Sequence, residues 1–353
     1  MSAALPNPPR VSVVVPTYKA GPFLLELCAS LVAQTMPDFE VLVLSDGCDD
    51  HQQPGLERYA ADPRFRFLSW TPNQGVARAT EQLLREVRAP FWCNPGADDL
   101  LHPEFLAHRL AAAEKTPAAD IFFGAGIQID AHGREIWYHP ARVLAERLAA
   151  WGGQTIEPAA MLRVLLQENV INTPSIFCRS ATTIAPLLAA EVRWKYAQDY
   201  HYWLLLAGLG RHFHYDARVL HSYRMSDGQL SRDPAREATR LAEFRLVPLV
   251  ALRQAADQSP LAASVWREWK RPLHDFWLWR KLLLARRGQL SRAWSEQASV
   301  AYHGRALSRA AQLLEFCVRA PAMAALRWGE KRRARRQIWT NGLRLVDEPI
   351  FRA

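Results

Sequence analysis

The chain has 353 residues, of which 49% are hydrophobic and 22% charged. This balance is typical of globular proteins and excludes a disordered, collagen-like or coiled-coil chain. There is no apolar run of about 18 residues, so no transmembrane helix is expected, and no secretory signal is visible at the N-terminus. The five cysteines are odd in number and far apart in the sequence, which argues against a disulfide framework and favours a reducing, cytoplasmic compartment.

Positive charge is concentrated in the last third of the chain. The net charge is +9 overall, but residues 234–353 carry 23 basic and 10 acidic side chains, whereas residues 1–233 carry 21 and 25. The same third holds seven of the 13 tryptophans. We therefore expect two domains, 1–232 and 233–353, the second of which faces an anionic partner.

Residues 11–45 are predicted to form a βαβ unit. Residues 11–15 and 41–44 are short apolar runs typical of buried strands, and apolar residues recur at helical spacing between them. Two such strands joined by a helix are almost always parallel. The elements expected downstream are strand 64–70, helix 75–87, strand 90–94, helix 103–114, strands 120–130 and 135–139, helix 197–209 and strand 211–224. The pattern beyond Pro234 is helical only, so we predict an α/β domain with a mostly parallel sheet, followed by an all-helical basic region.

Polar clusters follow three of the predicted strands. They are Pro16-Thr17-Tyr18, Asp46-Gly47 and Gly96-Ala97-Asp98-Asp99. Open parallel sheets bind ligands in the crevice beyond the carboxyl ends of their strands, so the three clusters together predict a ligand site. Each also has a simpler interpretation: Thr17 as a helix cap, Asp46-Gly47 as a turn, and Asp98-Asp99 as charges near a helix start.

Five sequence blocks resemble glycosyltransferase family 2, the inverting enzymes of GT-A fold. In order, they are VSVVVPTYKAGPFLLELCASLVAQTMPDFEVLVLSDGCDD, NQGVARA, APFWCNPGADDLLHPEFL, AQDYHYWLLLAGLG and YRMSDGQLS. The resemblance covers residues 10–232 and implies a Rossmann-like GT-A domain that binds a nucleotide sugar. The implied activity is transfer of a sugar from a nucleotide-diphosphate donor, expected to be a UDP-sugar, to a hydroxyl of a glycan or lipid-linked acceptor. The implied setting is the synthesis of a bacterial surface polysaccharide.

The resemblance also implies roles for single residues. Asp98 matches the last aspartate of the family's D-x-D motif and would bind Mg²⁺ or Mn²⁺, which neutralises the diphosphate leaving group. Asp199 would deprotonate the acceptor hydroxyl as general base; its alternative is an N-cap of the helix at 199–209. Asp227 is a second candidate metal ligand and equally well a turn residue. The implied donor-binding residues are Pro16, Thr17, Tyr18, Asp46, Gly47, Arg78, Ala97 and Asp98, with Asp46 accepting the imide N–H of a uracil.

The chain departs from the family pattern at several positions. Ser45, Gly96, Gln198 and Ser226 stand where the family usually has Asp, Asp, Glu and His; Lys19 replaces an Asn, and Thr80 stands where an Arg is expected, with Arg78 nearby. These departures leave open a weak or inactive enzyme. The alternatives are therefore a non-catalytic GT-A module that binds a nucleotide sugar or a protein partner, and a nucleotidyltransferase, whose usual Gly-rich triphosphate loop is not evident.

Tryptophans lie among basic residues in two parts of the C-terminal region, 261–287 and 328–339. This combination predicts contact with an anionic membrane surface, and it would place a cytoplasmic protein peripherally at the inner face of the plasma membrane. The alternative is a set of helices packed on the catalytic domain with a solvated basic face. Nucleic acid is not an expected partner, because no nucleic-acid motif accompanies the charge.

Overall fold

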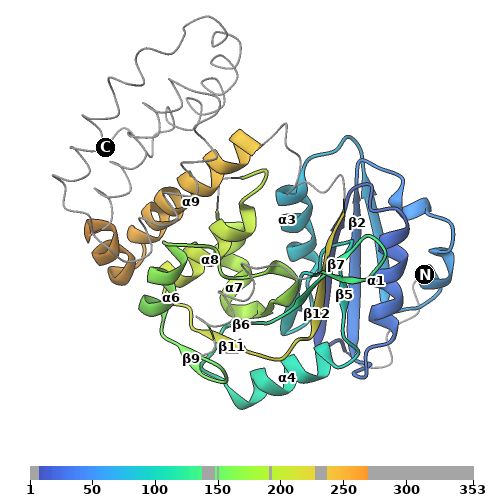
Figure 1. Cartoon of the computed structure of the whole chain (residues 1–353), viewed down its shortest axis with the longest axis horizontal. Coiled ribbons are helices and arrows are strands. Elements are labelled where there is room, and N and C mark those ends of the chain that lie inside the picture. The colour runs from blue at the N-terminus through green and yellow to red at the C-terminus, as the bar shows by residue number, and fades with distance from the viewer. Residues whose placement is uncertain (1–7, 137–147, 149–150, 191–192, 227–236, 269–353) are drawn as a thin grey trace, which may run out of the picture. The chain divides into compact units, whose positions relative to one another are not determined.

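The computed structural model describes residues 8–136, 148, 151–190, 193–226 and 237–268. The chain divides into two compact units, of which the first comprises Met1–Asp233 and Val250–Trp266 and the second Pro234–Leu249 and Arg267–Ala353. Residues 250–266 therefore group with the first unit, and the predicted boundary after residue 232 stays a prediction. Figure 1 shows the described residues as a coloured ribbon.

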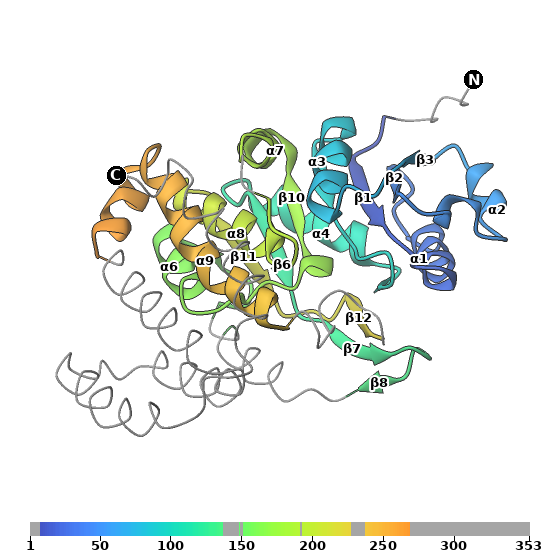
Figure 2. The ribbon, with the colours of Figure 1, turned by 90° about the horizontal axis from the view of Figure 1, so that it is seen from above.

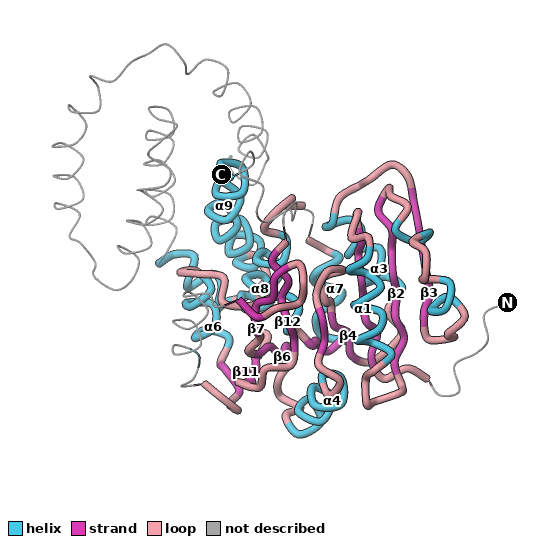
Figure 3. The backbone as a smooth tube through the Cα atoms, turned by 45° about the vertical axis from the view of Figure 1, so that its right-hand side comes forward, coloured by secondary structure: helices cyan, strands magenta, loops and turns pink. Residues whose placement is uncertain are grey.

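An eight-stranded sheet with the order β3-β2-β1-β4-β10-β6-β11-β9 forms the centre of the first unit. Its strands are β1 (Val11–Thr17), β2 (Phe39–Asp46), β3 (Phe65–Trp70), β4 (Phe91–Cys93), β6 (Ile121–Gly124), β9 (Thr155–Ile156), β10 (Phe177–Arg179) and β11 (Phe213–Asp216). The strands β3, β2, β1 and β4 run parallel to one another, and β6 and β11 form a second parallel pair. The strand β10 is antiparallel to both β4 and β6, and β9 is antiparallel to β11. Figure 3 shows β2 and β3 side by side at one end of this sheet. The predicted α/β class with a mostly parallel sheet is confirmed.

A smaller sheet has the order β5-β12-β7-β8. It contains β5 (Leu100–Leu101), β7 (Ile127–Asp130), β8 (Glu135–Ile136) and β12 (His221–Met225), and Figure 2 shows β12, β7 and β8 lying together. The predicted strands 120–130 and 211–224 were wrong as single strands, because each is divided between the two sheets. At the first division a Cβ on Gly126 would lie 2.2 Å from the ring of His221, so a glycine lets the chain pass close to β12.

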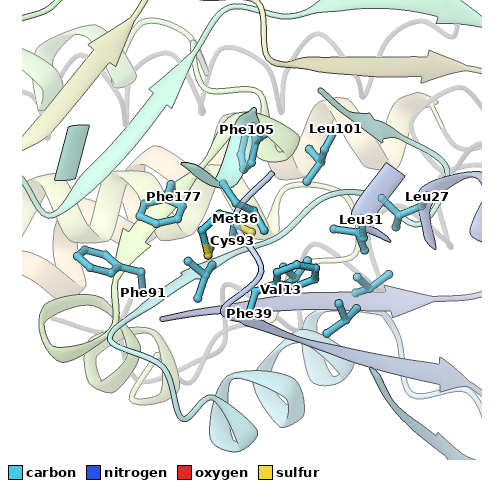
Figure 4. Close-up of a cluster of buried hydrophobic side chains, with 14 of the residues drawn as sticks. Val13, Leu27, Leu31, Met36, Phe39, Phe91, Cys93, Leu101, Phe105 and Phe177 are labelled. Carbon is cyan, nitrogen blue, oxygen red and sulfur yellow. The ribbon is translucent and has the colours of Figure 1, made fainter. Parts of the chain in front are cut away.

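Helices cover both faces of the large sheet. They are α1 (Pro22–Val32), α2 (Glu57–Ala60), α3 (Val76–Glu86), α4 (Phe105–Lys115), α6 (Pro158–Leu165), α7 (Ser180–Leu188) and α8 (Gln198–Gly208), with the short 3₁₀ helices η1 (Asp50–Gln52) and η2 (Thr173–Ser175). Successive side chains of a strand point to opposite faces. Val11, Val13 and Val15 accordingly join the buried cluster formed with α1 and α4 (Figure 4), while α3 packs against β1 and β2.

The helix α9 spans Glu237–Ala256, and its residues from Val250 onward belong to the first unit. A Cβ on Gly208 would lie 2.6 Å from the Cβ of Ala255, so the end of α8 packs tightly against this segment. Within the described residues, no helix combines the length and the apolar character needed to cross a bilayer.

Candidate functional site

The parallel register brings two of the predicted polar clusters to one edge of the large sheet. Thr17 at the end of β1 pairs with Ser45 near the end of β2. The strand β4 lies on the other side of β1, with Cys93 beside Val13, and the loop 94–99 follows directly. The carboxyl ends of these strands are where ligands of such sheets bind.

Asp50, which the sequence analysis did not single out, organises the loop after β1. The hydroxyl of Thr17 donates to Asp50 Oδ2 at 2.5 Å, and the backbone N–H groups of Ala20 and Gly21 donate to the same carboxylate at 3.0 and 3.3 Å. The helix α1 has Gly21 at its N-cap without a side-chain cap, so the cap interpretation of Thr17 was wrong. Tyr18 beside it is 50% exposed, and the amine of Lys19 lies 5.2 Å from the centroid of its ring.

Asp46 holds the segment that leads into α3. Its Oδ1 accepts from Trp70 Nε1 at 2.5 Å and from the backbone of Gln74 at 2.7 Å, and its Oδ2 accepts from the backbone of Gly75 at 2.8 Å. The side chain is 2% exposed. Both carboxylate oxygens therefore already accept hydrogen bonds from the chain. A contact between Asp46 and a uracil base stays a prediction.

Gly47 is required by its backbone geometry. Its φ is +68°, and a Cβ there would lie 2.2 Å from the backbone nitrogen of Asn73. Only glycine adopts this region without strain, so the turn after β2 and the segment before α3 are locked together. Arg78 lies on the exposed first part of α3 and donates to Gln74 Oε1 at 3.3 Å.

The loop containing Asp98 is held by its neighbour Asp99. The Asp99 carboxylate accepts from the backbone N–H of Arg224 at 2.8 Å, and the Asp99 N–H donates to the Gly96 carbonyl at 3.1 Å. Burial and the adjacent Asp98 charge raise the pKa of Asp99 well above its usual value. A Cβ on Gly96 would lie 2.4 Å from Asp99 Oδ2, so a side chain at the first D-x-D position would displace the Asp99 carboxylate from its present place.

Asp98 and Ala97 occupy partly exposed positions of this loop. Within the described residues, no three His, Cys, Asp or Glu side chains gather closely enough to hold a metal ion by themselves. Mg²⁺ in nucleotide sites is usually bound by one or two carboxylates together with substrate phosphates, so a single partly exposed Asp98 fits that mode of binding. Asp227, the second candidate ligand, lies outside the described residues.

Asp199 lies in the first turn of α8, and its carboxylate faces the segment 169–173. Thr173 Oγ1 donates to Asp199 Oδ2 at 2.9 Å, and Asn169 Nδ2 donates to the same oxygen at 3.4 Å. Burial raises the pKa of Asp199, while the hydrogen bond from Thr173 opposes that rise. The N-cap residue is Ala197, so the interpretation of Asp199 as the N-cap was wrong.

The strand β12 connects the surroundings of the two aspartates. Its residue Arg224 binds Asp99, the neighbour of Asp98, and the strand packs against η2. The first residue of η2 is Thr173, which binds Asp199. The loop of Asp98 is therefore bound to β12 directly, and Asp199 is linked to β12 through η2, although about 100 residues separate the two aspartates in the sequence.

Residues 12–172 match the sequence model of Glycosyl transferase family 2. This region is a glycosyltransferase family 2 domain. Over 136 residues the chain is 30% identical to a chondroitin synthase of Escherichia coli, an alignment that covers 38% of this chain and 20% of that protein. Over 121 residues it is 31% identical to an N-acetylglucosaminyltransferase of Sinorhizobium fredii (strain NBRC 101917 / NGR234), covering 33% of this chain and 29% of that protein. The chain thus spans less than a third of the length of these curated relatives.

Solved structures show the same fold. The chain aligns with S. aureus TarS 1-349 in complex with UDP-GlcNAc at a TM-score of 0.54 and 19% identity, covering 69% of this chain and 66% of that one. The complex of TarS 1-349 with UDP gives a TM-score of 0.50 and 18% identity over 69% and 65% of the two chains. The GT-A fold predicted from the sequence blocks is thereby confirmed.

Proposed function

We propose that the protein is a metal-dependent, inverting glycosyltransferase. It transfers a sugar from a UDP-sugar to a hydroxyl of a glycan or lipid-linked acceptor during the synthesis of a bacterial surface polysaccharide. The family assignment supports sugar transfer, and the TarS complexes with UDP and UDP-GlcNAc favour uridine as the base of the donor.

The observation that carries the proposal is the placement of two carboxylates around β12. Asp98 sits on a loop fixed from β12 through Asp99, and Asp199 is held by Thr173 of η2, which packs on the same strand. In the proposed displacement, Asp98 would act near the leaving group by holding the metal ion, and Asp199 would act near the nucleophile as the base. The strand β12 links the two carboxylates, because it binds the loop of Asp98 and packs against η2, which holds Asp199.

Asp199 is the general base in this proposal. Its pKa is raised by burial, and a carboxylate with a raised pKa is a better proton acceptor at neutral pH. The acceptor hydroxyl gives its proton to Asp199, and its oxygen forms a bond to the anomeric carbon while the bond to the diphosphate breaks on the opposite face. Thr173 and Asn169, which donate to its Oδ2, hold the carboxylate in one orientation.

The donor lies against the carboxyl edge of the large sheet. Pro16, Thr17 and Tyr18 line the base and ribose, Gly47 and Arg78 lie along the same edge, and Ala97 and Asp98 face the diphosphate. Asp98, with Asp227 as the candidate second ligand, would hold Mg²⁺ or Mn²⁺ together with the donor phosphates. The bound cation would neutralise charge on the departing diphosphate.

The acceptor is presented at a membrane in this proposal. The basic and tryptophan-rich parts of the C-terminal region, 261–287 and 328–339, would contact anionic lipid at the inner face of the plasma membrane, and the enzyme would otherwise be cytoplasmic. Apart from residues 261–268, both parts lie outside the described residues. The support for this part of the proposal is therefore the sequence pattern.

Thermal stabilisation by nucleotides tests the donor assignment, because a ligand that binds the native state raises its stability. UDP and UDP-sugars should raise the Tm of the full chain in the presence of Mn²⁺ and much less without it, while GDP and CDP should have little effect. Stabilisation without sugar transfer or donor hydrolysis would favour the non-catalytic module. Release of pyrophosphate from UTP would favour the nucleotidyltransferase.

A further inference from the structure

Arg224 is a buried arginine whose guanidinium contacts three separate parts of the fold. The residue is 0% exposed. Its Nε donates to the Asp98 carbonyl at 2.7 Å, its Nη1 donates to the carbonyl of Ala131 at 3.2 Å, and its Nη2 forms an ion pair with Glu26 of α1. Its Cζ lies 4.5 Å from the ring centroid of Phe23.

These contacts converge on the loop that carries Asp98. The side chain of Arg224 holds the Asp98 carbonyl, and its backbone N–H binds the Asp99 carboxylate at 2.8 Å. Two consecutive residues of the loop are thus fixed by one residue of β12. The contacts to α1 and to the turn after β7 hold the guanidinium independently of the loop.

We propose that Arg224 is a positioning residue that sets the backbone of the loop 96–99 and thereby aims the Asp98 carboxylate. The consequence for metal and donor binding rests on the proposed function. The consequence for the loop itself does not, because it depends only on the contacts of Arg224.

Arginine is the side chain that this arrangement needs. A planar guanidinium donates along several fixed directions at once, here toward the loop, the turn after β7 and Glu26. Lysine would keep the charge but has a single nitrogen, which cannot reach all three acceptors. A buried cation that lacks some of its partners is costly, so Arg224→Lys should also lower the stability of the protein.

Arg109 supplies a matched control for that loss of stability. It is also 0% exposed, it pairs with Asp216 at 3.2 Å, and its Cζ lies 5.6 Å from the ring centroid of Phe105. Arg109→Lys therefore perturbs a buried arginine that, like Arg224, pairs with a carboxylate and stacks on a phenylalanine, but does so through Asp216 and Phe105. A difference between the two variants reports on that loop.

Glu26→Ala is a milder variant that removes the carboxylate partner of Arg224 at the protein surface. The Glu26 side chain is 47% exposed, so its removal is compatible with folding, while Arg224 stays in place without its carboxylate partner. The loop 96–99 should then loosen in the same direction as in Arg224→Lys but to a smaller extent.

Hydrogen exchange of the full chain tests the role in the loop directly. Peptides that cover residues 94–101 should exchange about tenfold faster in Arg224→Lys and measurably faster in Glu26→Ala, and at the wild-type rate in Arg109→Lys. In the same proteins the apparent affinity for Mn²⁺ in the presence of UDP should fall by about 10- to 100-fold in Arg224→Lys, by less in Glu26→Ala, and not in Arg109→Lys. Unchanged exchange at 94–101 in both Arg224→Lys and Glu26→Ala, or equal acceleration in Arg109→Lys, would overturn the inference. Wild-type protein that binds no UDP with Mn²⁺ would instead overturn the proposed function, and the exchange rates would still decide the role of Arg224.

Discussion

The hydroxyl of Thr173 donates a 2.9 Å hydrogen bond to Asp199 Oδ2. It connects the 3₁₀ helix η2 with the first turn of α8. Its effect on Asp199 is opposite to that of burial: burial raises the pKa of the carboxyl, and this hydrogen bond stabilises the ionised form and lowers it. Thr173 therefore adjusts the pH range in which Asp199 can accept a proton.

Replacing Thr173 by valine should move the acidic limb of the pH–rate profile. A general base must be ionised, so kcat falls as the pH drops through the pKa of Asp199, which lies above the usual aspartate value of about 3.9. Thr173→Val removes a stabilising donor, and the limb should shift to higher pH. Thr182→Val on α7 is the matched control and should leave the limb in place. An unshifted limb in Thr173→Val would show that Asp199 does not set it.

The sequence predicted the local elements well and the contacts between distant residues poorly. The buried strands β1 and β2 and the helices α3 and α8 follow from apolar periodicity, which is a local property. The strand β10 has only three residues and carries no pattern of its own, so its antiparallel insertion between β4 and β6 was not foreseeable.

In the candidate site too, sequence motifs pointed to single residues but not to the distant residues that bind them. Asp46, Asp98 and Asp199 could be proposed as site residues because they stand in recognisable motifs. The residues that hold them were missed: Thr173 binds a carboxylate 26 positions away, and Arg224 binds a loop 126 positions away. Asp50 follows a turn and resembles any solvated acidic residue, although it binds Thr17, Ala20 and Gly21. Such pairings depend on the fold and leave no signal in a single sequence.

Asp98→Asn should separate metal binding from folding. Asp98 lies on a partly exposed loop, and asparagine retains the size of the side chain but loses its charge. The Tm without ligand should change little, while the stabilisation by UDP with Mn²⁺ should be lost. Metal-dependent UDP binding equal to that of wild type would contradict the metal role of Asp98.

Asp46→Asn should weaken the segment that leads into α3. The amide would present N–H groups where an oxygen now accepts from Gly75 at 2.8 Å, and a buried unsatisfied donor costs about 1–3 kcal/mol. Trp70→Phe removes one donor to the same carboxylate and should cost less. Urea unfolding and UDP titration together decide the role: wild-type stability with weakened UDP binding would indicate direct contact with the base.

The C-terminal region should bind anionic membranes. Each basic residue near such a surface contributes about 1 kcal/mol, so wild-type protein should co-sediment with anionic vesicles, weakly with neutral ones, and less as salt increases. Reversing Arg332, Arg333, Arg335 and Arg336 to glutamate should release it, while activity on a small acceptor survives. Equal binding to both vesicle types, or binding to neither, would contradict the membrane assignment.

The most direct test of the central claim is the configuration of the sugar released or transferred from α-linked UDP-sugars, followed by proton NMR with Mn²⁺ present. The account predicts that wild-type protein forms the β anomer first. It predicts that Asp199→Asn lowers turnover by about 10²- to 10⁴-fold, with UDP affinity nearly unchanged. A product that retains the α configuration, or full turnover by Asp199→Asn, would contradict an inverting transferase with Asp199 as its base.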